Sequence, residues 1–337
     1  MNKIGVILNN IGSPSSPEPE DVGNYLKEFL MDKEILTLPY ILRYILVHFI
    51  IVPRRKYFSA EKYKKIWGLK KSPLIEISED FCAGVQRELG ENYNVQLGMV
   101  NGQPSIEKAL DNLKESGVGQ IIFAPLYPQY AKATTYAATQ KTKAKLKKVF
   151  GEYDNLKVLK PFYNHPGFIE LSAKKLMKEW DSGQWQHIMF SFHGLPEAQI
   201  KKNQGCLTNL NCCQRANACE INCYRAQSIK TAELIAESAN LKTNQYTICF
   251  QSRLGPAKWI GPSSIGVVQQ LAQKGYKKLL VQTPSFVADC LETLEEVAIE
   301  LKSEFKLHGG DDLKLVDCLN QDLSWVQKFT VLIQELK

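Results

Sequence analysis

Short apolar runs alternate with amphipathic stretches along nearly the whole chain. The runs predict buried strands at residues 5–8, 95–99, 121–126, 158–161, 187–192, 246–251, 278–282 and 314–317. The stretches between them predict helices, among them those at residues 21–31, 76–89, 106–116, 135–150 and 325–336. Regular alternation of strands and helices is typical of parallel sheets covered by helices.

The strands and helices fall into two sets, and this predicts an α/β fold of two doubly wound, Rossmann-like parallel-sheet domains facing a central cleft. The stretch around Asp154 interrupts the pattern, so we place the domain boundary there. The predicted domains span residues 1–154 and 155–320, and residues 321–337 form a closing helix expected to pack on the first domain.

One predicted strand, at residues 187–192, ends in His193, and Gly194 and Pro196 follow directly. In open α/β sheets, ligands bind at the carboxyl ends of the strands. An imidazole at such a place can exchange protons near neutral pH. The residues alone support equally a catalytic histidine and a histidine that is simply packed at the strand end.

Other chemically active residues also follow predicted strands directly. They include Asn10 and Ile11 after the first strand, Tyr127 after the third, the 252–259 stretch and the 289–296 stretch. Because the carboxyl ends of parallel strands meet at one edge of a sheet, this placement predicts one shared cleft.

Four acidic residues, Asp289, Glu292, Glu296 and Glu300, are spaced by three, four and four positions. This spacing predicts one acidic face on a helix. A solvated surface helix is one interpretation. A functional role is favoured because the row begins at a strand's carboxyl end, with Asp289 and Glu292 in the first helical turn, where the helix dipole supports negative charge.

Composition indicates a soluble globular protein: of 337 residues, 44% are apolar and 23% charged, and the net charge is +7. The lysines at 141–148 read as a solvated helix face, so no nucleic-acid partner is expected. The N-terminus lacks a secretory pattern, which predicts a cytoplasmic protein whose nine cysteines are not paired in disulfides.

An apolar segment within residues 38–55 stands out. It is interrupted by Arg43 and His48, and it is too short and too charged to span a bilayer. The alternatives are an amphipathic segment lying in a membrane interface and a buried core helix.

A segment at residues 203–224 contains five of the nine cysteines: Cys206, Cys212, Cys213, Cys219 and Cys223. Structural zinc sites usually combine closely spaced pairs of cysteines, and here only Cys219 and Cys223, four positions apart, form such a pair. The wider, uneven spacing favours an iron–sulfur cluster held by four thiolates over zinc. Cys212 and Cys213 compete for one position, and we favour Cys213.

Several motifs together resemble those of the ferrochelatases, which insert ferrous iron into a porphyrin to make haem, and the resemblance runs nearly end to end. The matching stretches are NIGSP at 10–14, YKKIWG at 63–68, SPL at 72–74, YPQY at 127–130, SFHGLP at 191–196, QSRLGP at 251–256, WIGP at 259–262, FVAD at 286–289 and LETL at 291–294.

The resemblance implies a chelatase-like fold and assigns site residues. His193 would be the catalytic base, and Glu292 the acid facing it across the porphyrin, with the iron substrate at these two residues. Asp289 and Glu296 would be the acids behind Glu292. Cys290 stands where some members of the family have a histidine, which weakens a metal-relay role at that position.

The resemblance also implies how the porphyrin is held. Ile11, Tyr127 and Trp259 would form apolar walls, while Arg55 and Tyr63 would bind the propionates, for which an arginine fork is well suited. Some relatives have a further arginine where this chain has Val100 and Asn101.

The remaining implications concern the membrane, the cysteines and the substrate. The 38–55 segment would be an apolar lip on the cytoplasmic side of the inner membrane, giving a peripheral membrane protein, and the cysteines would hold a [2Fe-2S] cluster. The lip favours protoporphyrin IX over coproporphyrin as the substrate.

Two alternatives to the ferrochelatase function are a chelatase for cobalt or another tetrapyrrole, and a non-catalytic haem-binding or redox-sensing protein. Monomer and homodimer both remain open.

Overall fold

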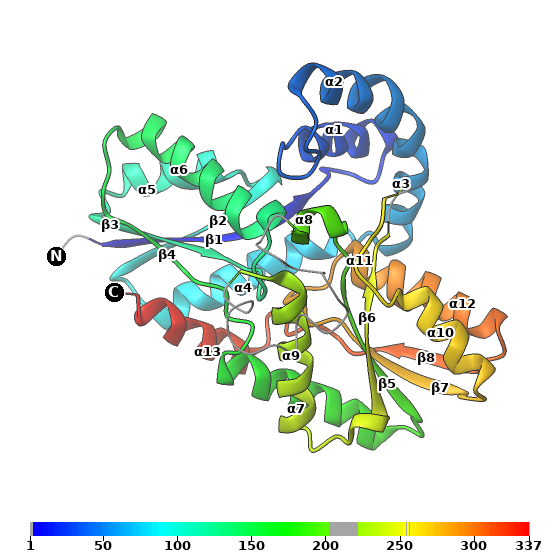
Figure 1. Cartoon of the computed structure of the whole chain (residues 1–337). Coiled ribbons are helices and arrows are strands. Elements are labelled where there is room, and N and C mark those ends of the chain that lie inside the picture. Colours follow the sequence, from blue (N-terminus) through cyan, green and yellow to red (C-terminus); the bar gives the residue numbers. More distant parts are fainter. Residues whose placement is uncertain (1–2, 202–221, 254, 256, 337) are drawn as a thin grey trace. The chain divides into compact units, whose positions relative to one another are not determined.

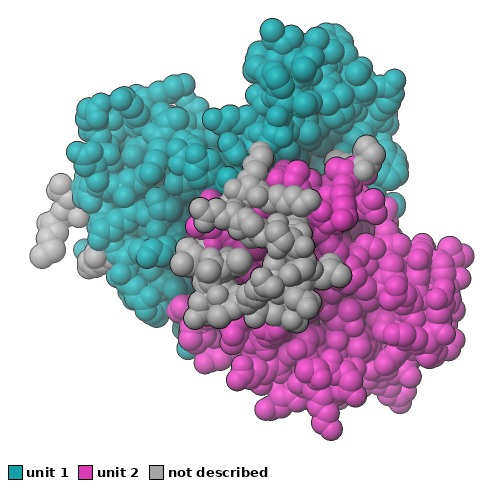
Figure 2. Space-filling view, in the orientation of Figure 1, with its two compact units in different colours: residues 1–126, 132–160, 321–337 teal, residues 127–131, 161–320 magenta. Residues whose placement is uncertain are grey.

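The computed structural model describes residues 3–201, 222–253, 255 and 257–336, and the chain divides into two compact units (Figure 2). Unit 1 comprises residues 1–126, 132–160 and 321–337. Unit 2 comprises residues 127–131 and 161–320. The chain therefore passes from the first unit to the second after Lys160, six residues beyond the boundary that we place at Asp154.

Unit 1 is built on a four-stranded parallel sheet with strand order β2-β1-β3-β4 (Figure 1). The strands are β1 (Ile4–Ser13), β2 (Tyr93–Gly102), β3 (Gln120–Pro125) and β4 (Leu156–Val158). Its helices are α1 (Pro19–Leu30), α2 (Tyr40–Ile45), η1 (Leu46–Ile51), α3 (Val52–Ile66), α4 (Pro73–Leu89), α5 (Ile106–Glu115), η2 (Lys132–Tyr136), α6 (Ala137–Phe150) and α13 (Leu323–Gln334). Val6, Ile7 and Leu8 are completely buried, as expected of a central parallel strand covered on both faces.

Strand β4 corrects one expectation. The sequence pattern places a strand at 158–161 in the second half, but Leu156 of β4 pairs with Ile121 of β3, in the first sheet. A strand of three residues has too little periodicity to indicate which sheet it joins.

The closing helix α13 packs on α4 within unit 1. Phe81 of α4 stacks on Trp325 at 6.3 Å between ring centroids and meets Phe329 edge-on at 5.3 Å. Trp325 and Phe329 are completely buried. The apolar face of the last helix therefore completes the core of the first unit.

Unit 2 repeats the architecture, with strand order β6-β5-β7-β8. Its strands are β5 (His187–His193), β6 (Tyr246–Gln251), β7 (Lys278–Gln282) and β8 (Asp312–Leu315). Its helices are α7 (Pro166–Ser182), α8 (Glu197–Lys201), α9 (Tyr224–Ser238), η4 (Thr243–Gln245), α10 (Ser264–Gln273), α11 (Leu291–Leu294), η5 (Glu296–Leu301) and α12 (Lys302–Leu307). One core cluster joins the inner strands to α10, η5 and α12, with Val281, Val268 and Phe305 completely buried.

Candidate active site

His193 is the last residue of β5, as the sequence predicts, and its side chain is partly buried. The strand is fully buried up to that point. The ring of Phe286, from the turn after β7, meets the imidazole edge-on at 6.3 Å between centroids. His193 therefore sits at the carboxyl end of a central strand, beside the segment that leads from β7 into α11.

The environment of His193 keeps its imidazole neutral. Burial lowers the pKa of His193, while the Glu292 carboxylate and a hydrogen bond with the Gly194 backbone oppose this shift only in part. His193 and Glu292, the base and the leading acid of the sequence-predicted site, therefore interact electrostatically within unit 2. A neutral imidazole is the form that accepts a proton.

Backbone contacts fix the position of Glu292. It lies in the first turn of α11, and its carbonyl oxygen accepts a hydrogen bond of 2.6 Å from the Gln251 side chain at the end of β6. Gln251 also accepts a hydrogen bond from Ser191 of β5 at 2.7 Å. The first turn of α11 is thus tied to the two strands that end at the site.

The acidic row does not form the single helical face that the spacing predicts. Asp289 lies outside the helix, because Cys290 is the N-cap of α11, and α11 is only four residues long. A π-helical segment, η5, follows, so the regular three- and four-residue register is broken. π turns inside helices are frequent at functional sites, and the wider turn is not encoded in apolar spacing.

The members of the row have different surroundings. Glu292 and Glu296 are partly exposed, and Glu300 is exposed. The Ser252 hydroxyl donates to a carboxylate oxygen of Glu296, and Ser252 has a φ of 63°, an unusual conformation for a residue other than glycine.

Asp289 is the most buried member and is tightly held. Its carboxylate accepts hydrogen bonds from the Thr293 hydroxyl at 2.9 Å, the Asn320 amide at 2.7 Å and the Cys318 backbone N–H at 3.3 Å. Its own N–H donates to the Asn320 side chain at 2.9 Å. These contacts tie the start of α11 to the segment after β8.

Two buried thiols flank this carboxylate. Burial and the nearby Glu292 charge raise the pKa of the Cys290 thiol, and burial and the nearby Asp289 charge raise that of Cys318. Both thiols are therefore neutral at physiological pH. Cys82, Cys249, Cys290 and Cys318 are all free thiols.

Trp259 lies next to Gly194, the residue that follows His193. A Cβ atom added to Gly194 would lie 3.3 Å from the Trp259 ring and only 2.5 Å from the Gln251 carbonyl oxygen. Trp259 also forms an antiparallel bridge with Pro196. The absence of a side chain at Gly194 therefore leaves room for the Gln251 backbone and the Trp259 ring.

Tyr127 belongs to the short 127–131 segment of unit 2. Its hydroxyl is buried and makes no hydrogen bond to any residue that the structure describes. Burial raises the pKa of Tyr127. Gln129 of the same segment donates to Thr231 of α9 at 3.1 Å and to the Pro284 carbonyl at 3.2 Å, which fixes the segment against the site's own unit.

The other three sequence-predicted site residues belong to unit 1. Ile11 lies in β1 and is partly buried, and its N–H donates to the Asn10 side chain at 2.8 Å. Arg55 and Tyr63 lie two turns apart on α3, and Tyr63 is buried against Trp67, with ring centroids 6.0 Å apart. Asn101, where some relatives have an arginine, donates to the Ile11 carbonyl at 3.3 Å.

The 38–55 segment is not a buried core helix. Ile41, Phe49 and Leu42 are 70%, 68% and 56% exposed, whereas Val47 is completely buried against α1. In this segment the charged Arg43 is buried while apolar neighbours are exposed. Arg43 is 8% exposed and donates to the carbonyl oxygens of residues 36 and 38.

Pro53 stands in the first turn of α3, directly after the π-helical η1, so the helical segment continues past it. Among the described residues, no helix combines the length and the apolar character needed to cross a membrane.

Four cysteines of the 203–224 segment lie outside the described residues: Cys206, Cys212, Cys213 and Cys219. Cys223 is described, is buried and forms the N-cap of α9.

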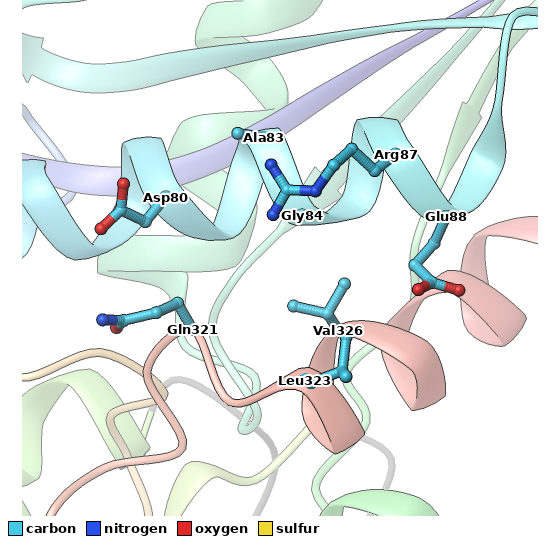
Figure 3. Close-up of a pocket in the computed structure, with 8 residues that line it drawn as sticks. All are labelled: Asp80, Ala83, Gly84, Arg87, Glu88, Gln321, Leu323 and Val326. Carbon is cyan, nitrogen blue, oxygen red and sulfur yellow. The ribbon is translucent and has the colours of Figure 1, made fainter.

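A pocket of about 300 Å³ lies in unit 1 between α4 and the start of α13 (Figure 3). The backbone at Gly84 approaches Val326 closely, and Asp80, Arg87 and Gln321 surround the opening. None of the sequence-predicted site residues lines it.

Two residues that contact His193 were missed by sequence reasoning. The Tyr224 hydroxyl donates to the His193 carbonyl oxygen at 2.8 Å, and the Ser285 hydroxyl accepts from the His193 N–H at 3.1 Å. Ser285 comes three residues after the end of β7, and this position at a strand's carboxyl end could have marked it as a site residue. Tyr224 follows the cysteine segment, and no motif marks it.

Two four-stranded parallel sheets with flanking helices define a chelatase-like α/β protein. The structure of SirB from Bacillus subtilis with Fe3+ aligns with a TM-score of 0.55 at 10% identity, covering 99% of this chain and 95% of the other. CbiX, the terminal enzyme for biosynthesis of siroheme in denitrifying bacteria, aligns at 0.50 and 10% identity, with 99% of each chain covered. At such low identity the likeness concerns the fold.

The chain belongs to the ferrochelatase family, whose model matches residues 3–336. The ferrochelatase of Bdellovibrio bacteriovorus is 44% identical over 336 residues and covers 100% of both chains. That of Stutzerimonas stutzeri is 41% identical, covering 97% of this chain and 96% of its own. The chain is thus a member of an enzyme family of metal chelatases.

Proposed function

We propose that this chain inserts ferrous iron into protoporphyrin IX to form protohaem, the ferrochelatase reaction of haem biosynthesis. The observation that carries the proposal is His193, kept neutral by burial at the carboxyl end of β5 and interacting with the Glu292 carboxylate. Membership of the family supports iron as the metal and a porphyrin as the acceptor.

The reaction requires a base, because metal insertion removes two pyrrole N–H protons. The neutral His193 imidazole accepts a pyrrole proton. The nearby Glu292 carboxylate stabilises the imidazolium that forms. Glu296, farther along the same chain segment, and the buried Asp289 then provide an acidic path for proton exit or for entry of the iron substrate.

The macrocycle needs apolar contacts that hold it in a bent shape, because bending exposes the nitrogen lone pairs. We assign this role to Trp259, Tyr127 and Ile11. Arg55 and Tyr63 are assigned to the propionates.

The lip is proposed to rest on the cytoplasmic surface of the inner membrane. Apolar side chains that are mostly exposed, such as Ile41 and Phe49, are held outward by a small core around Val47. An exposed apolar surface of this kind binds in the lipid interface. Entry from a membrane favours the poorly soluble protoporphyrin over the more acidic coproporphyrin.

A [2Fe-2S] cluster is proposed for the cysteine segment, held by Cys206, Cys213 or Cys212, Cys219 and Cys223. Four thiolates are the donor set that such a cluster requires, and the segment supplies five thiols. When bound, the cluster would supply redox-active iron, and Cys223, the N-cap of α9, would be one of its ligands. Iron insertion itself transfers no electrons, so no step of the reaction passes through the cluster.

The cluster has its own test. Purified protein should be coloured and contain iron and acid-labile sulfide in equal amounts, and Cys213→Ser should abolish both while Cys212→Ser keeps them. Colourless protein that carries zinc would contradict the assignment.

The function is tested by mixing the purified protein anaerobically with ferrous iron and protoporphyrin IX and following the Soret band. We expect a shift to the haem spectrum with enzyme turnover. Parallel reactions with coproporphyrin and with Co²⁺ test the alternative chelatases. Tight porphyrin binding without turnover for any metal would indicate a non-catalytic haem-binding protein.

A further inference from the structure

The pairing of β5 ends at different residues on its two sides. On one side it continues through His193, which pairs with Gln251 of β6. On the other side it stops at Phe190, which pairs with Gln282, the last residue of β7. The last residues of β5 therefore project beyond β7 and need other partners for their peptide groups on that side.

The His193 peptide groups face this open side. The Gly194 N–H donates to the Gln251 carbonyl toward β6, at 2.8 Å. Because the peptide groups of successive residues in a strand point to opposite sides, the N–H and C=O of His193 point away from β6. They would lack partners if side chains did not replace the missing strand.

Two hydroxyl groups supply these partners and close a ring. The His193 N–H donates to Ser285 Oγ at 3.1 Å, and the Tyr224 hydroxyl donates to the His193 carbonyl at 2.8 Å. The two hydroxyl oxygens are 3.0 Å apart. Since Tyr224 gives its only hydrogen to the carbonyl, Ser285 donates its own to Tyr224, and each of the three residues donates once and accepts once.

The ring rests on a buried helix. Tyr224 is 6% exposed and opens α9, where the Ser228 hydroxyl donates to its carbonyl oxygen at 2.9 Å. Gln227 of the same helix accepts from the Tyr130 N–H at 2.6 Å, so α9 also holds the segment that contains Tyr127. Hydrogen bonds protected from water hold their geometry better than exposed ones.

We propose that Tyr224, acting with Ser285, is a positioning residue that fixes the backbone of His193 and thereby aims its imidazole at the porphyrin. The inference rests on the catalytic role proposed for His193. A base must lie within hydrogen-bond reach of the proton that it removes, so a small displacement reduces the rate of the chemical step more than substrate binding.

The experiment compares three variants of the full-length protein: Tyr224→Phe, Ser285→Ala and the double variant. Each removes a hydroxyl from the ring and leaves the core filled. We expect kcat for iron insertion to fall about tenfold in Tyr224→Phe, with KM for protoporphyrin within about twofold of wild type, because misplacement of about 1 Å costs up to about 100-fold. The double variant should lose little more than either single variant, since both break one ring.

Tyr276→Phe is the matched control. Tyr276 packs on His187 at the opposite end of β5, with ring centroids 5.1 Å apart, so its change tests loss of a tyrosine hydroxyl from the same sheet. Its kcat should equal that of wild type.

Crystal structures of wild type and Tyr224→Phe decide the inference independently of activity. We expect the His193 imidazole to be displaced by about 1 Å in the variant. An unmoved imidazole together with unchanged kcat, or with a loss that merely follows a lower melting temperature, would overturn the inference. If wild-type protein fails to insert iron, the proposed function fails, and displacement of His193 still tests the ring.

Discussion

At the scale of single residues, the protonation of His193 depends on two opposing effects. Burial disfavours the imidazolium, whereas the Glu292 carboxylate favours it, and burial dominates. In the proposed reaction, the neutral imidazole would accept a proton, and the Glu292 carboxylate would stabilise it once it is charged. His193 and Glu292 interact within unit 2.

Replacing His193 by alanine removes the proton acceptor without disturbing the apolar walls. We expect kcat for haem formation to fall by at least about 100-fold, the usual contribution of a general base, while KM for protoporphyrin changes little. Steady-state kinetics of the Soret shift measure both quantities. His308→Ala, which removes the histidine directly after α12, is the control and should keep full activity.

The pH dependence of the reaction follows from the same residue. Because the pKa of His193 is lowered from the ordinary value of 6.5, the imidazole stays neutral at pH values where a surface histidine is already charged. The acid limb of kcat/KM should therefore lie below pH 6.5, with the protein still folded by circular dichroism. An acid limb centred at or above pH 6.5 would show that burial does not lower the pKa of His193.

At the scale of elements, the site is built where strands stop and loops cross closely. Gly194 lets the chain after β5 pass the end of β6, and the π-helical η5 shifts the acids after Glu292 out of simple helical register. Both the crossing at Gly194 and the π-helical turn of η5 are features of the backbone, and neither supplies a reacting group.

Gly194→Ala tests the close crossing. The added methyl group would lie 2.5 Å from a backbone oxygen, which cannot move without shifting β6. We expect a loss of about 1–3 kcal/mol in the free energy of unfolding, measured by urea denaturation, together with lower activity. Gly23→Ala is the control, because in α1 the methyl group meets the flexible Lys56 side chain at 3.3 Å and Val52 at an ordinary contact distance of 3.6 Å. A stable, fully active Gly194→Ala protein would refute this account of the crossing.

The lip can be tested apart from catalysis. Ile41→Glu places a charge on a side chain that is 70% exposed, so stability should be unchanged while binding to sedimented lipid vesicles falls at least about tenfold. Leu307→Glu, at a 79% exposed residue of α12, introduces the same charge outside the lip and should bind vesicles like wild type. Equal vesicle binding by both variants would rule out the lip as the membrane contact.

At the scale of the whole molecule, apolar periodicity predicted most of the architecture. The strands at 246–251 and 278–282 match β6 and β7 at both ends, and His193 lies at the end of β5 as expected. These features depend on local runs of buried residues bounded by turn-forming residues, and such runs are visible in a single sequence.

The features that escaped prediction depend on contacts between distant segments. Arg43 is buried because carbonyl groups at 36 and 38 surround its guanidinium, and β4 joins the first sheet because β3 offers an open edge. Tyr224 contacts His193 although the two residues are 31 positions apart in the sequence. Apolar spacing along the chain contains no information on these contacts.

The most direct test of the account is a crystal structure of the protein with bound porphyrin. We predict that the macrocycle is bent, that the His193 imidazole faces its pyrrole nitrogens within hydrogen-bond reach, and that Trp259 and Glu292 lie against it. A flat porphyrin bound out of contact with His193 would contradict the account.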